Sequence, residues 1–274
     1  MKMKSKELTN VPIPSGQVRK VTYSYGGAAY VFKKEHTTAQ NNLTRRRSFP
    51  PVNRGEPMLK AAYKRMLNRK FSELIELDID NEKCLSLTLT IRNAKYNAYE
   101  KISDRFKHFT NEVRSSKKVG SSYVGAVRFI EVQEKGFFHI HCILVFDTAD
   151  IKLTWKDLHR MWGWGFVKVT AVYYLIGLID YLTNLKQGVK NEQNDKFTRY
   201  PKKARVIYIS PNLPRGKSEN IDMTVEECAA LINDENCIGH LKMHKYLDTE
   251  TQKVKTCIDK MVLIQILEKR GSSK

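Results

Sequence analysis

The stretch Phe137 to Phe146, F-F-H-I-H-C-I-L-V-F, decides the fold, because two histidines interrupt an otherwise apolar run at alternate positions. Side chains two apart on a β-strand lie on the same face, so His139 and His141 project side by side. The residues between and beyond them, such as Ile140 and Cys142, then face the opposite side of the sheet. Two neighbouring imidazoles in this arrangement are candidate ligands of one metal ion.

A second apolar and β-branched run, 127–133, precedes this strand and is separated from it by Glu134-Lys135-Gly136. A short, glycine-containing break between two such runs predicts a tight hairpin. With a loop of about three residues, Glu131 lies opposite His139 and shares a face with both histidines. A register shift of one residue would instead bring Gln133 nearer and turn Glu131 away.

A His, His, carboxylate set with open positions suits Mn²⁺ or Mg²⁺, although imidazole also accepts Zn, Ni or Cu. For a His-x-His pair alone, a surface or hydrogen-bonded pair without metal is the more frequent arrangement. The paired glutamate and the apolar flanks favour a metal site, because buried histidines need a polar partner. We therefore expect His139, His141 and Glu131 to hold a divalent ion.

The charge of the chain points to a polyanionic partner. It carries 48 Lys and Arg against 29 Asp and Glu, a formal net charge of +19, which is typical of nucleic-acid binding. With 274 residues and 41% hydrophobic content it can bury a full core. No apolar run reaches the ~18 residues of a membrane span, and residues 1–20 lack a signal-peptide hydrophobic region. We expect a soluble, cytoplasmic protein without a membrane partner.

The five cysteines are scattered, odd in number and contain no C-x-x-C pair. This pattern argues against a disulfide framework and against a zinc ribbon. Reduced, mostly buried thiols are expected for Cys84, Cys142, Cys228, Cys237 and Cys257.

The remaining patterns predict alternating strands and helices around the histidine strand. The expected elements are a hairpin at 18–34, a basic amphipathic helix at 57–76, a strand at 85–92, a helix at 97–118, a hairpin at 123–146, a short helix capped by Thr154, a strand at 165–172, a helix at 173–185 and a strand at 204–210. This order predicts an α+β fold in which helices pack on a ferredoxin-like or RRM-like antiparallel sheet. We divide the chain into a basic N-terminal extension (1–80), a central domain (81–215) and a C-terminal appended module (216–274).

Five motifs in the central region resemble those of rolling-circle replication initiators of the HUH endonuclease superfamily, found in plasmids and phages. They are L-S-L-T-L-T at 85–90, F-I-E-V-Q-E-K-G-F-F-H-I-H at 129–141, M-W-G-W-G-F-V-K-V from Met161, D-Y-L-T-N at 180–184 and I-S-P-N-L-P at 209–214. Their common order is more specific than any one motif. The resemblance implies the HUH endonuclease fold for residues 81–215.

By this resemblance Tyr181 is the nucleophile that joins single-stranded DNA at an origin hairpin through a 5′-phosphotyrosine link. The metal held by the two histidines and Glu131 would be Mn²⁺ or Mg²⁺. Tyr174 and Tyr173 stay open as alternative nucleophiles, because the sequence around Tyr181 departs from the family pattern. Gly177 stands where some members carry a second catalytic residue, which leaves the termination step unassigned.

Candidate DNA contacts are polar or basic residues near these motifs and in the N-terminal extension. They are Thr88, Thr90, Arg92, Arg45, Arg46, Arg47, Lys168 and Lys186. A solvated charge run explains the arginine cluster equally well. The resemblance further implies a host helicase and polymerase as partners, in a bacterial or other prokaryotic host cell.

Three other readings fit parts of the sequence. The same site would serve a conjugative relaxase or a single-tyrosine transposase. A non-catalytic basic module could bind single-stranded nucleic acid by stacking bases on Phe129, Phe137 and Tyr208. A metal-dependent hydrolase that activates water would cut DNA without forming a protein adduct.

Overall fold

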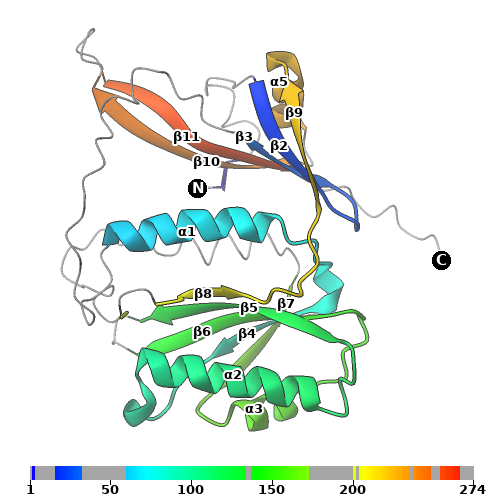
Figure 1. The fold of residues 1–274 in the computed structure, drawn as a ribbon, viewed down its shortest axis with the longest axis vertical. Helices are drawn as coiled ribbons and strands as arrows, with labels where there is room; N and C mark the ends of the chain where they lie inside the picture. The colour runs from blue at the N-terminus through cyan, green and yellow to red at the C-terminus, as the bar shows by residue number, and fades with distance from the viewer. Residues whose placement is uncertain are drawn as a thin grey trace. The chain divides into compact units, whose positions relative to one another are not determined.

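A computed structural model of the 274-residue chain describes residues 2–3, 16–32, 60–133, 137–172, 200–201, 204–234, 237–247 and 254–265. The chain forms two compact units (Figure 1). Met1–Pro50 and Arg215–Lys274 together make the terminal unit, and Pro51–Pro214 makes the central unit. Each unit has its own sheet and its own cluster of buried apolar residues.

The central unit contains a five-stranded antiparallel sheet with the order β7-β4-β6-β5-β8. Its strands are β4 (Cys84–Leu89), β5 (Tyr123–Val132), β6 (Phe138–Phe146), β7 (Val167–Ala171) and β8 (Ile207–Ile209). The first four along the chain lie in the spatial order fourth, first, third, second, which is the ferredoxin-like arrangement. The predicted α+β fold with helices on an antiparallel sheet is confirmed.

Helices α2 (Tyr99–Ser115) and α3 (Trp155–Trp162) cover one face of this sheet (Figure 1). The buried side chains of α2 recur at helical spacing, as the sequence predicted, and are Ile102, Phe106, Phe109 and Val113. Full burial of one such side chain contributes about 1.5–3 kcal/mol. Hydrophobic burial therefore fixes which face of β4, β5 and β6 lies under the helices.

The predicted cap of the short helix is confirmed. The Thr154 side chain accepts from the Asp157 N–H and the Asp157 carboxylate accepts from the Thr154 N–H, which is a complete capping box. The helix ends at Gly163, whose φ of 65° favours glycine. Lys118 also donates to Asp157 Oδ2 at 2.7 Å. These contacts fix the start and end of α3. The aromatic segment, residues 162–166, begins at the last residue of this helix.

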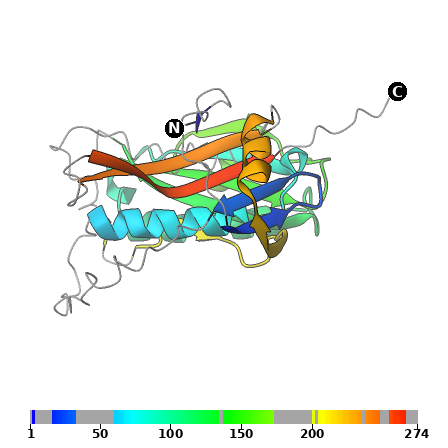
Figure 2. The ribbon, with the colours of Figure 1, turned by 90° about the horizontal axis from the view of Figure 1, so that it is seen from above.

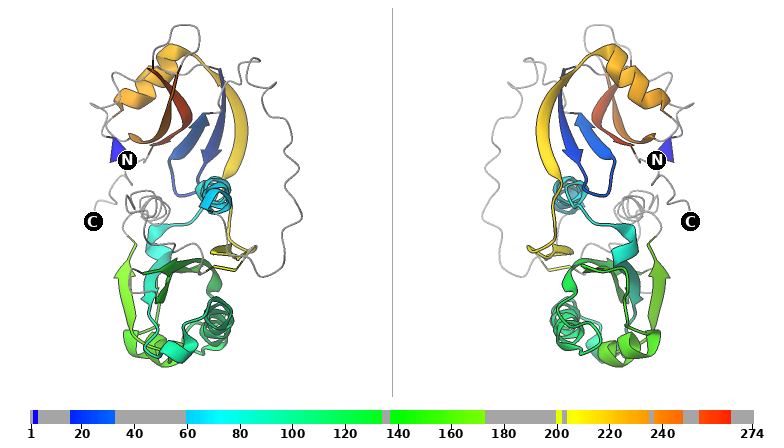
Figure 3. Two further views of the ribbon diagram at one scale, coloured as in Figure 1. Left: turned by 90° about the vertical axis from the view of Figure 1, so that its left-hand side faces the viewer. Right: turned by 90° about the vertical axis from the view of Figure 1, so that its right-hand side faces the viewer.

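Helix α1 (Lys60–Ile75) lies over the other face of the same sheet, next to β8 (Figures 1 and 3). Leu74, near its C-terminal end, is 1% exposed, and half-buried Met66 and Phe71 join the same apolar cluster. The predicted amphipathic helix at 57–76 is therefore present. This second face of the sheet is the one that carries the histidine pair.

The terminal unit is a six-stranded antiparallel sheet with the order β1-β10-β11-β3-β2-β9. Its elements are β1 (Lys2–Met3), β2 (Gly16–Thr22), β3 (Ala28–Phe32), β9 (Lys217–Met223), α5 (Val225–Asn233), β10 (Cys237–Leu247) and β11 (Val254–Gln265). Strands β10 and β11 form a long hairpin (Figure 2), against which α5 packs (Figure 3). A capping box formed by Thr224 and Glu227 starts α5.

Strands from the two ends of the chain pair with each other in this unit. The predicted N-terminal hairpin is present as β2 and β3, joined through Gly26 and Gly27 at φ 98° and 90°. Strand β2 then pairs with β9, and β3 pairs with β11. Local sequence patterns carry no signal for such long-range pairing, so the sequence predicts an N-terminal extension and a C-terminal module as separate parts.

The described cysteines are reduced, as the sequence predicts, whereas the predicted helix at 173–185 lies outside the described residues. Cys84, Cys142, Cys228 and Cys237 are free and buried. Burial raises the pKa of the Cys84 thiol to about 12, with a smaller contribution from Asp80. Within the described ranges, no helix has the length and apolar character needed to cross a membrane.

Candidate functional site

The histidine pair projects from β6, the middle strand of the five-stranded sheet. His139 and His141 are half-buried, whereas Phe138, Ile140 and Cys142 on the other face are at most 1% exposed. The alternation predicted from the sequence is therefore present. It places both imidazoles on the face opposite α2 and α3.

Glu131 on the neighbouring strand lies in the predicted register. Glu131 pairs with His139, and the Gln133 N–H donates to the Phe137 carbonyl at 2.8 Å to close the hairpin. The shifted register that would have turned Glu131 away is excluded. The Glu131 Oε2 atom lies 3.0 Å from Nε2 of His141, which is two residues beyond its register partner His139 on β6 and on the same face of the sheet.

The ring of His141 is held through both of its nitrogens. Thr88 on β4 pairs with His141, and its Oγ1 lies 3.3 Å from His141 Nδ1. In the tautomer protonated on Nε2, that N–H donates to Glu131 and the Thr88 hydroxyl donates to Nδ1. Side chains on both adjacent strands therefore fix the orientation of this imidazole.

His139 is held in its neutral form by its surroundings. Burial is the largest influence and lowers the pKa of His139, the nearby His141 lowers it further, and Glu131 opposes the shift. A neutral imidazole keeps a lone pair on one ring nitrogen. That lone pair is what a metal ion or a proton donor on a substrate would use.

The three predicted metal ligands have suitable donor atoms but do not surround a common point. Among the described residues, no three His, Cys, Asp or Glu side chains form a group arranged to hold a metal ion. His139, His141 and Glu131 nevertheless offer two imidazoles and one carboxylate on one face at adjacent register positions. This donor chemistry fits a divalent ion, and metal binding by the set stays a prediction.

A lysine extends the row that contains His141. Lys168 on the edge strand β7 pairs with Thr88, which in turn pairs with His141. Paired residues of antiparallel strands share a face of the sheet. The exposed Lys168 therefore lies on the same face as the His141 imidazole, two strands away from it. A cation at this position is suited to a phosphate group near the histidines.

The predicted DNA contacts just after β4, Thr90 and Arg92, differ in their surroundings. The Thr90 hydroxyl accepts from the Phe166 N–H at 2.8 Å and donates to the Phe166 carbonyl at 3.2 Å, so it joins β4 to the segment before β7. Arg92 is exposed and lines a cleft of about 720 Å³. Thr90 thus has a structural role here, while Arg92 is available to a ligand.

Aromatic rings form the wall of this cleft. Tyr96 and Trp164 stack with their ring centroids 4.5 Å apart, and the Lys95 ammonium lies 4.7 Å from the Tyr96 centroid. Phe166, which also lines the cleft, is 58% exposed, an unusual value for a phenylalanine. Accessible flat rings beside Arg92 and Lys95 are the combination that stacks unpaired bases and attracts phosphates.

The aromatic segment is fixed to the end of β4. The Trp162 indole N–H donates to the Thr90 carbonyl at 2.7 Å, and the Arg92 N–H donates to the Trp164 carbonyl at 2.9 Å. A Cβ atom at Gly165 would lie 2.4 Å from the Thr90 carbonyl oxygen, so only glycine permits this approach. These contacts join the cleft to the segment that directly follows β4.

Several predicted residues lie outside the described part of the chain. These are the nucleophile candidates Tyr181, Tyr174 and Tyr173, the cation Lys186, and the arginine cluster Arg45, Arg46 and Arg47. A described phenol near the site, Tyr200, is unsuited to attack because its hydroxyl donates to Ile130 O and accepts from Val132 N. Burial also raises the pKa of Tyr200.

The aromatic residues that the sequence suggested as a base-stacking surface differ in accessibility and in the face that they occupy. Phe129 is 3% exposed, and Tyr208 lies on the opposite face of the sheet from the histidines. Phe166 is 58% exposed, whereas Phe137, Tyr208, Tyr96 and Trp164 are all half-buried. In the sequence, W-G-W-G-F carries only the family resemblance, and Gly165 is the one signal there of a close backbone approach.

Comparison with known proteins gives a family match. Residues 84–186 match the model of the replication-associated protein ORF2 family. Searches of the curated proteins and of the solved structures gave no significant match. The matched segment contains β4 to β7, with Glu131, His139 and His141, and supports a role as a replication initiator.

Proposed function

We propose that this protein is a rolling-circle replication initiator of the HUH superfamily, which nicks and rejoins single-stranded DNA at a replication origin. The observation that carries the proposal is the group of His139, His141 and Glu131 on one face of the sheet, within the segment that matches the replication-associated family. The same face offers Lys168 to a phosphate. The net charge of +19 supports a nucleic-acid substrate.

In the proposed reaction the Tyr181 phenolate attacks a DNA phosphorus atom. The bond from phosphorus to the 3′ oxygen breaks, that oxygen takes up a proton to become a 3′-hydroxyl, and the 5′ phosphate stays esterified to the tyrosine. A returning 3′-hydroxyl reverses the exchange and joins the strand. One phosphodiester is exchanged for another, so the reaction needs no ATP.

Each residue of the site has a proposed role. His139, His141 and Glu131 would hold a divalent ion, Mn²⁺ or Mg²⁺, and such an ion when bound withdraws charge from the phosphate undergoing attack. Thr88 orients His141 through Nδ1. Bases beside the cleaved phosphate would stack on Trp164 and Phe166, which suits a single strand because paired bases have no free faces.

The test is adduct formation with labelled single-stranded origin DNA and Mn²⁺. We expect a covalent protein–DNA product that survives SDS and is lost in Tyr181→Phe. Tyr174→Phe and Tyr173→Phe are the matched controls, since each removes one hydroxyl from the same segment of sequence. An adduct that persists in Tyr181→Phe but disappears in one of these controls would reassign the nucleophile.

A conjugative relaxase or a single-tyrosine transposase would use the same chemistry on other DNA. Nicking assays with oligonucleotides from replication origins, transfer origins and transposon ends separate the three. For the initiator we also expect dependence on a host helicase and polymerase, because nicking alone neither unwinds the duplex nor extends the 3′ end. Rolling-circle synthesis reconstituted from purified components would test this dependence.

A second candidate function is a basic module that binds single-stranded nucleic acid without cutting it. It is favoured by the aromatic cleft, where stacked Tyr96 and Trp164 lie beside the cations Lys95 and Arg92. Such a module would bind single strands with a steep salt dependence and give no adduct under any divalent ion. A water-activating hydrolase would instead release two free DNA ends.

A further inference from the structure

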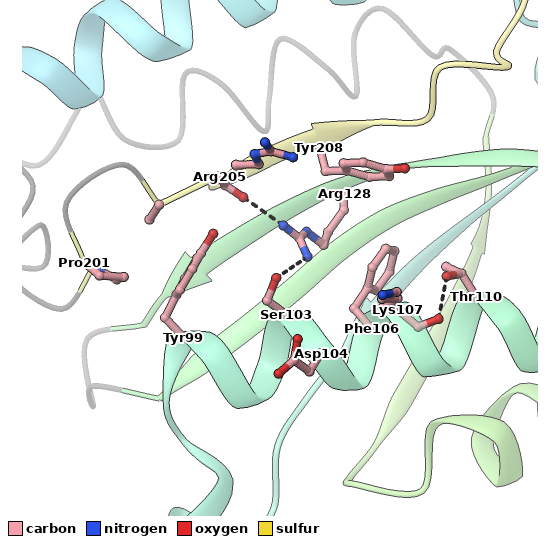
Figure 4. A pocket seen from close by; sticks show the side chains of 11 residues that line it. Tyr99, Ser103, Asp104, Phe106, Lys107, Thr110, Arg128, Pro201, Arg205 and Tyr208 are labelled. Atoms are coloured by element: carbon pink, nitrogen blue, oxygen red, sulfur yellow. Dashed lines mark hydrogen bonds between the residues drawn. The ribbon is translucent and has the colours of Figure 1, made fainter.

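A second pocket lies on the helix-covered face of the five-stranded sheet, away from the histidines. It has a volume of about 460 Å³ and lies between α2, β5 and the segment that leads into β8 (Figure 4). Arg128, at its base, pairs with Cys142 and Tyr208, whereas the next residue, Phe129, pairs with His141. The pocket and the candidate catalytic residues are therefore on opposite faces of one sheet.

Arg128 is a charged side chain in a buried place. It is 5% exposed, and its guanidinium donates to Ser103 Oγ at 2.9 Å and to the Arg205 carbonyl at 2.8 Å (Figure 4). Its Nε is the one buried side-chain nitrogen or oxygen, among those described, that has no hydrogen-bond partner. Burial lowers the pKa of Arg128, and no described carboxylate contributes to opposing that shift. Both hydrogen bonds go to neutral groups, and no ion pair among the described residues includes Arg128, so the charge of this pocket-lining side chain is suited to an anionic ligand.

The rest of the lining adds further positive charge and flat rings. Lys107 on α2 and Arg205 are exposed cations at the rim, against one carboxylate, Asp104, among the described lining residues. The Arg128 guanidinium lies 5.4 Å from the Phe106 ring centroid and 5.8 Å from that of Tyr208. Tyr99 and Tyr208 are half-buried, so each keeps part of its ring accessible (Figure 4).

We propose that this pocket binds one nucleotide of single-stranded DNA, with its phosphate at Arg128, Lys107 and Arg205 and its base against Tyr99 or Tyr208. The volume lies within the range of sites for small ligands and is too small for stacked base pairs of a duplex. Anion and base recognition together distinguish a nucleotide from inorganic phosphate. The pocket binds DNA without cutting it, so its occupancy does not depend on the nicking chemistry.

The experiment measures binding of a fluorescein-labelled single-stranded oligonucleotide to the full chain without divalent ions, where no cleavage interferes. In Lys107→Ala/Arg205→Ala, which changes two exposed residues, we expect affinity to fall by about tenfold or more. Lys117→Ala/Lys156→Ala is the control, because it removes the same charge at exposed positions outside the pocket. Equal affinities in the two double variants would overturn the proposal.

Two further measurements test the nucleotide itself. Tyr208→Leu should weaken binding of the normal oligonucleotide several-fold and leave binding of an abasic oligonucleotide unchanged. An oligonucleotide that carries 5-iodouracil should crosslink under ultraviolet light to the peptides of Tyr99 or Tyr208. If Tyr208→Leu weakened binding of a duplex as much as binding of the single strand, a single-nucleotide pocket would be contradicted. Crosslinks confined to the histidine face would contradict it as well. His141→Ala should retain these crosslinks even if it forms no adduct. Crosslinking therefore tests the pocket, and adduct formation tests the proposed function independently.

Discussion

The two faces of the central sheet accommodate polar side chains in different ways. On the histidine face, His141 is half-buried and is oriented by single contacts to Glu131 and Thr88. On the helix-covered face, Arg128 is 5% exposed and joins α2 to the segment before β8 through Ser103 and the Arg205 carbonyl. The difference indicates that a polar group on the histidine face contributes little to stability, whereas Arg128 on the other face is part of the framework.

The largest expected effect is on the chemistry of the histidine face. His141→Ala should slow adduct formation about a thousandfold, equivalent to about 4 kcal/mol in the transition state, because it removes a proposed metal ligand. Its free energy of unfolding should fall by about 1 kcal/mol or less, since the side chain is half-buried. Urea unfolding measures the free energy of unfolding, and adduct kinetics measure the rate of the reaction, both on one protein preparation. A loss of several kcal/mol in stability would erase the contrast between the faces.

The second effect concerns the stability of the other face. Arg128→Met keeps the volume but removes the hydrogen bonds to Ser103 and to the Arg205 carbonyl, and should lower the free energy of unfolding by about 3 kcal/mol. Urea denaturation, monitored by circular dichroism, measures this free energy of unfolding. Arg114→Met, at an exposed position on α2, is the control and should change stability by about 0.5 kcal/mol or less. If both variants were equally stable, Arg128 would have no role in the framework.

A smaller effect separates orientation from coordination on the histidine face. Thr88→Val preserves the shape of the side chain but removes the contact to His141 Nδ1, so adduct formation should slow about tenfold. Ser86→Ala, which removes a hydroxyl two residues earlier on β4, is the matched control and should keep nearly full activity. An equal loss in both variants would indicate a general effect on the strand rather than on the ring of His141.

The smallest effect tests whether the aromatic cleft belongs to the histidine face. Phe166→Ala should weaken binding of single-stranded DNA about fivefold through lost stacking, and leave the free energy of unfolding within about 0.5 kcal/mol because the ring is largely exposed. Val225→Ala, at an exposed apolar position in the terminal unit, is the control for nonspecific hydrophobic binding. Unchanged affinity in Phe166→Ala would remove the cleft from the DNA path.

The parts of the fold that depend on local periodicity could be predicted from the sequence. Alternation fixed the faces of β4 and β6, and a three-residue gap gave the register that places Glu131 beside the histidines. Helical spacing gave α2, and the threonine before α3 predicted its cap. In each of these cases the decisive interactions join residues that are close in sequence or lie on one hairpin.

The parts that depend on distant partners could not be predicted. Arg128 looked like one more basic residue in a strand, because only the assembled sheet brings Ser103, Tyr208 and the Arg205 carbonyl around it. Phe129 was suggested as a stacking residue, but packing on its own face buries it. The cleft at Trp164 and Phe166 likewise needed the close approach that Gly165 allows to Thr90. The identity of the nucleophile stays a prediction.

The sheet of the terminal unit has a consequence for the order in which a ribosome delivers the chain. Its β2–β3 hairpin leaves the exit tunnel early, while the partner strands β9 and β11 are made only after the whole central unit has been synthesised. Until then the early hairpin has open strand edges, which are sites for aggregation or chaperone binding. A released fragment 1–214, which lacks β9 and β11, should therefore contain a folded central unit and a protease-sensitive β2–β3 segment.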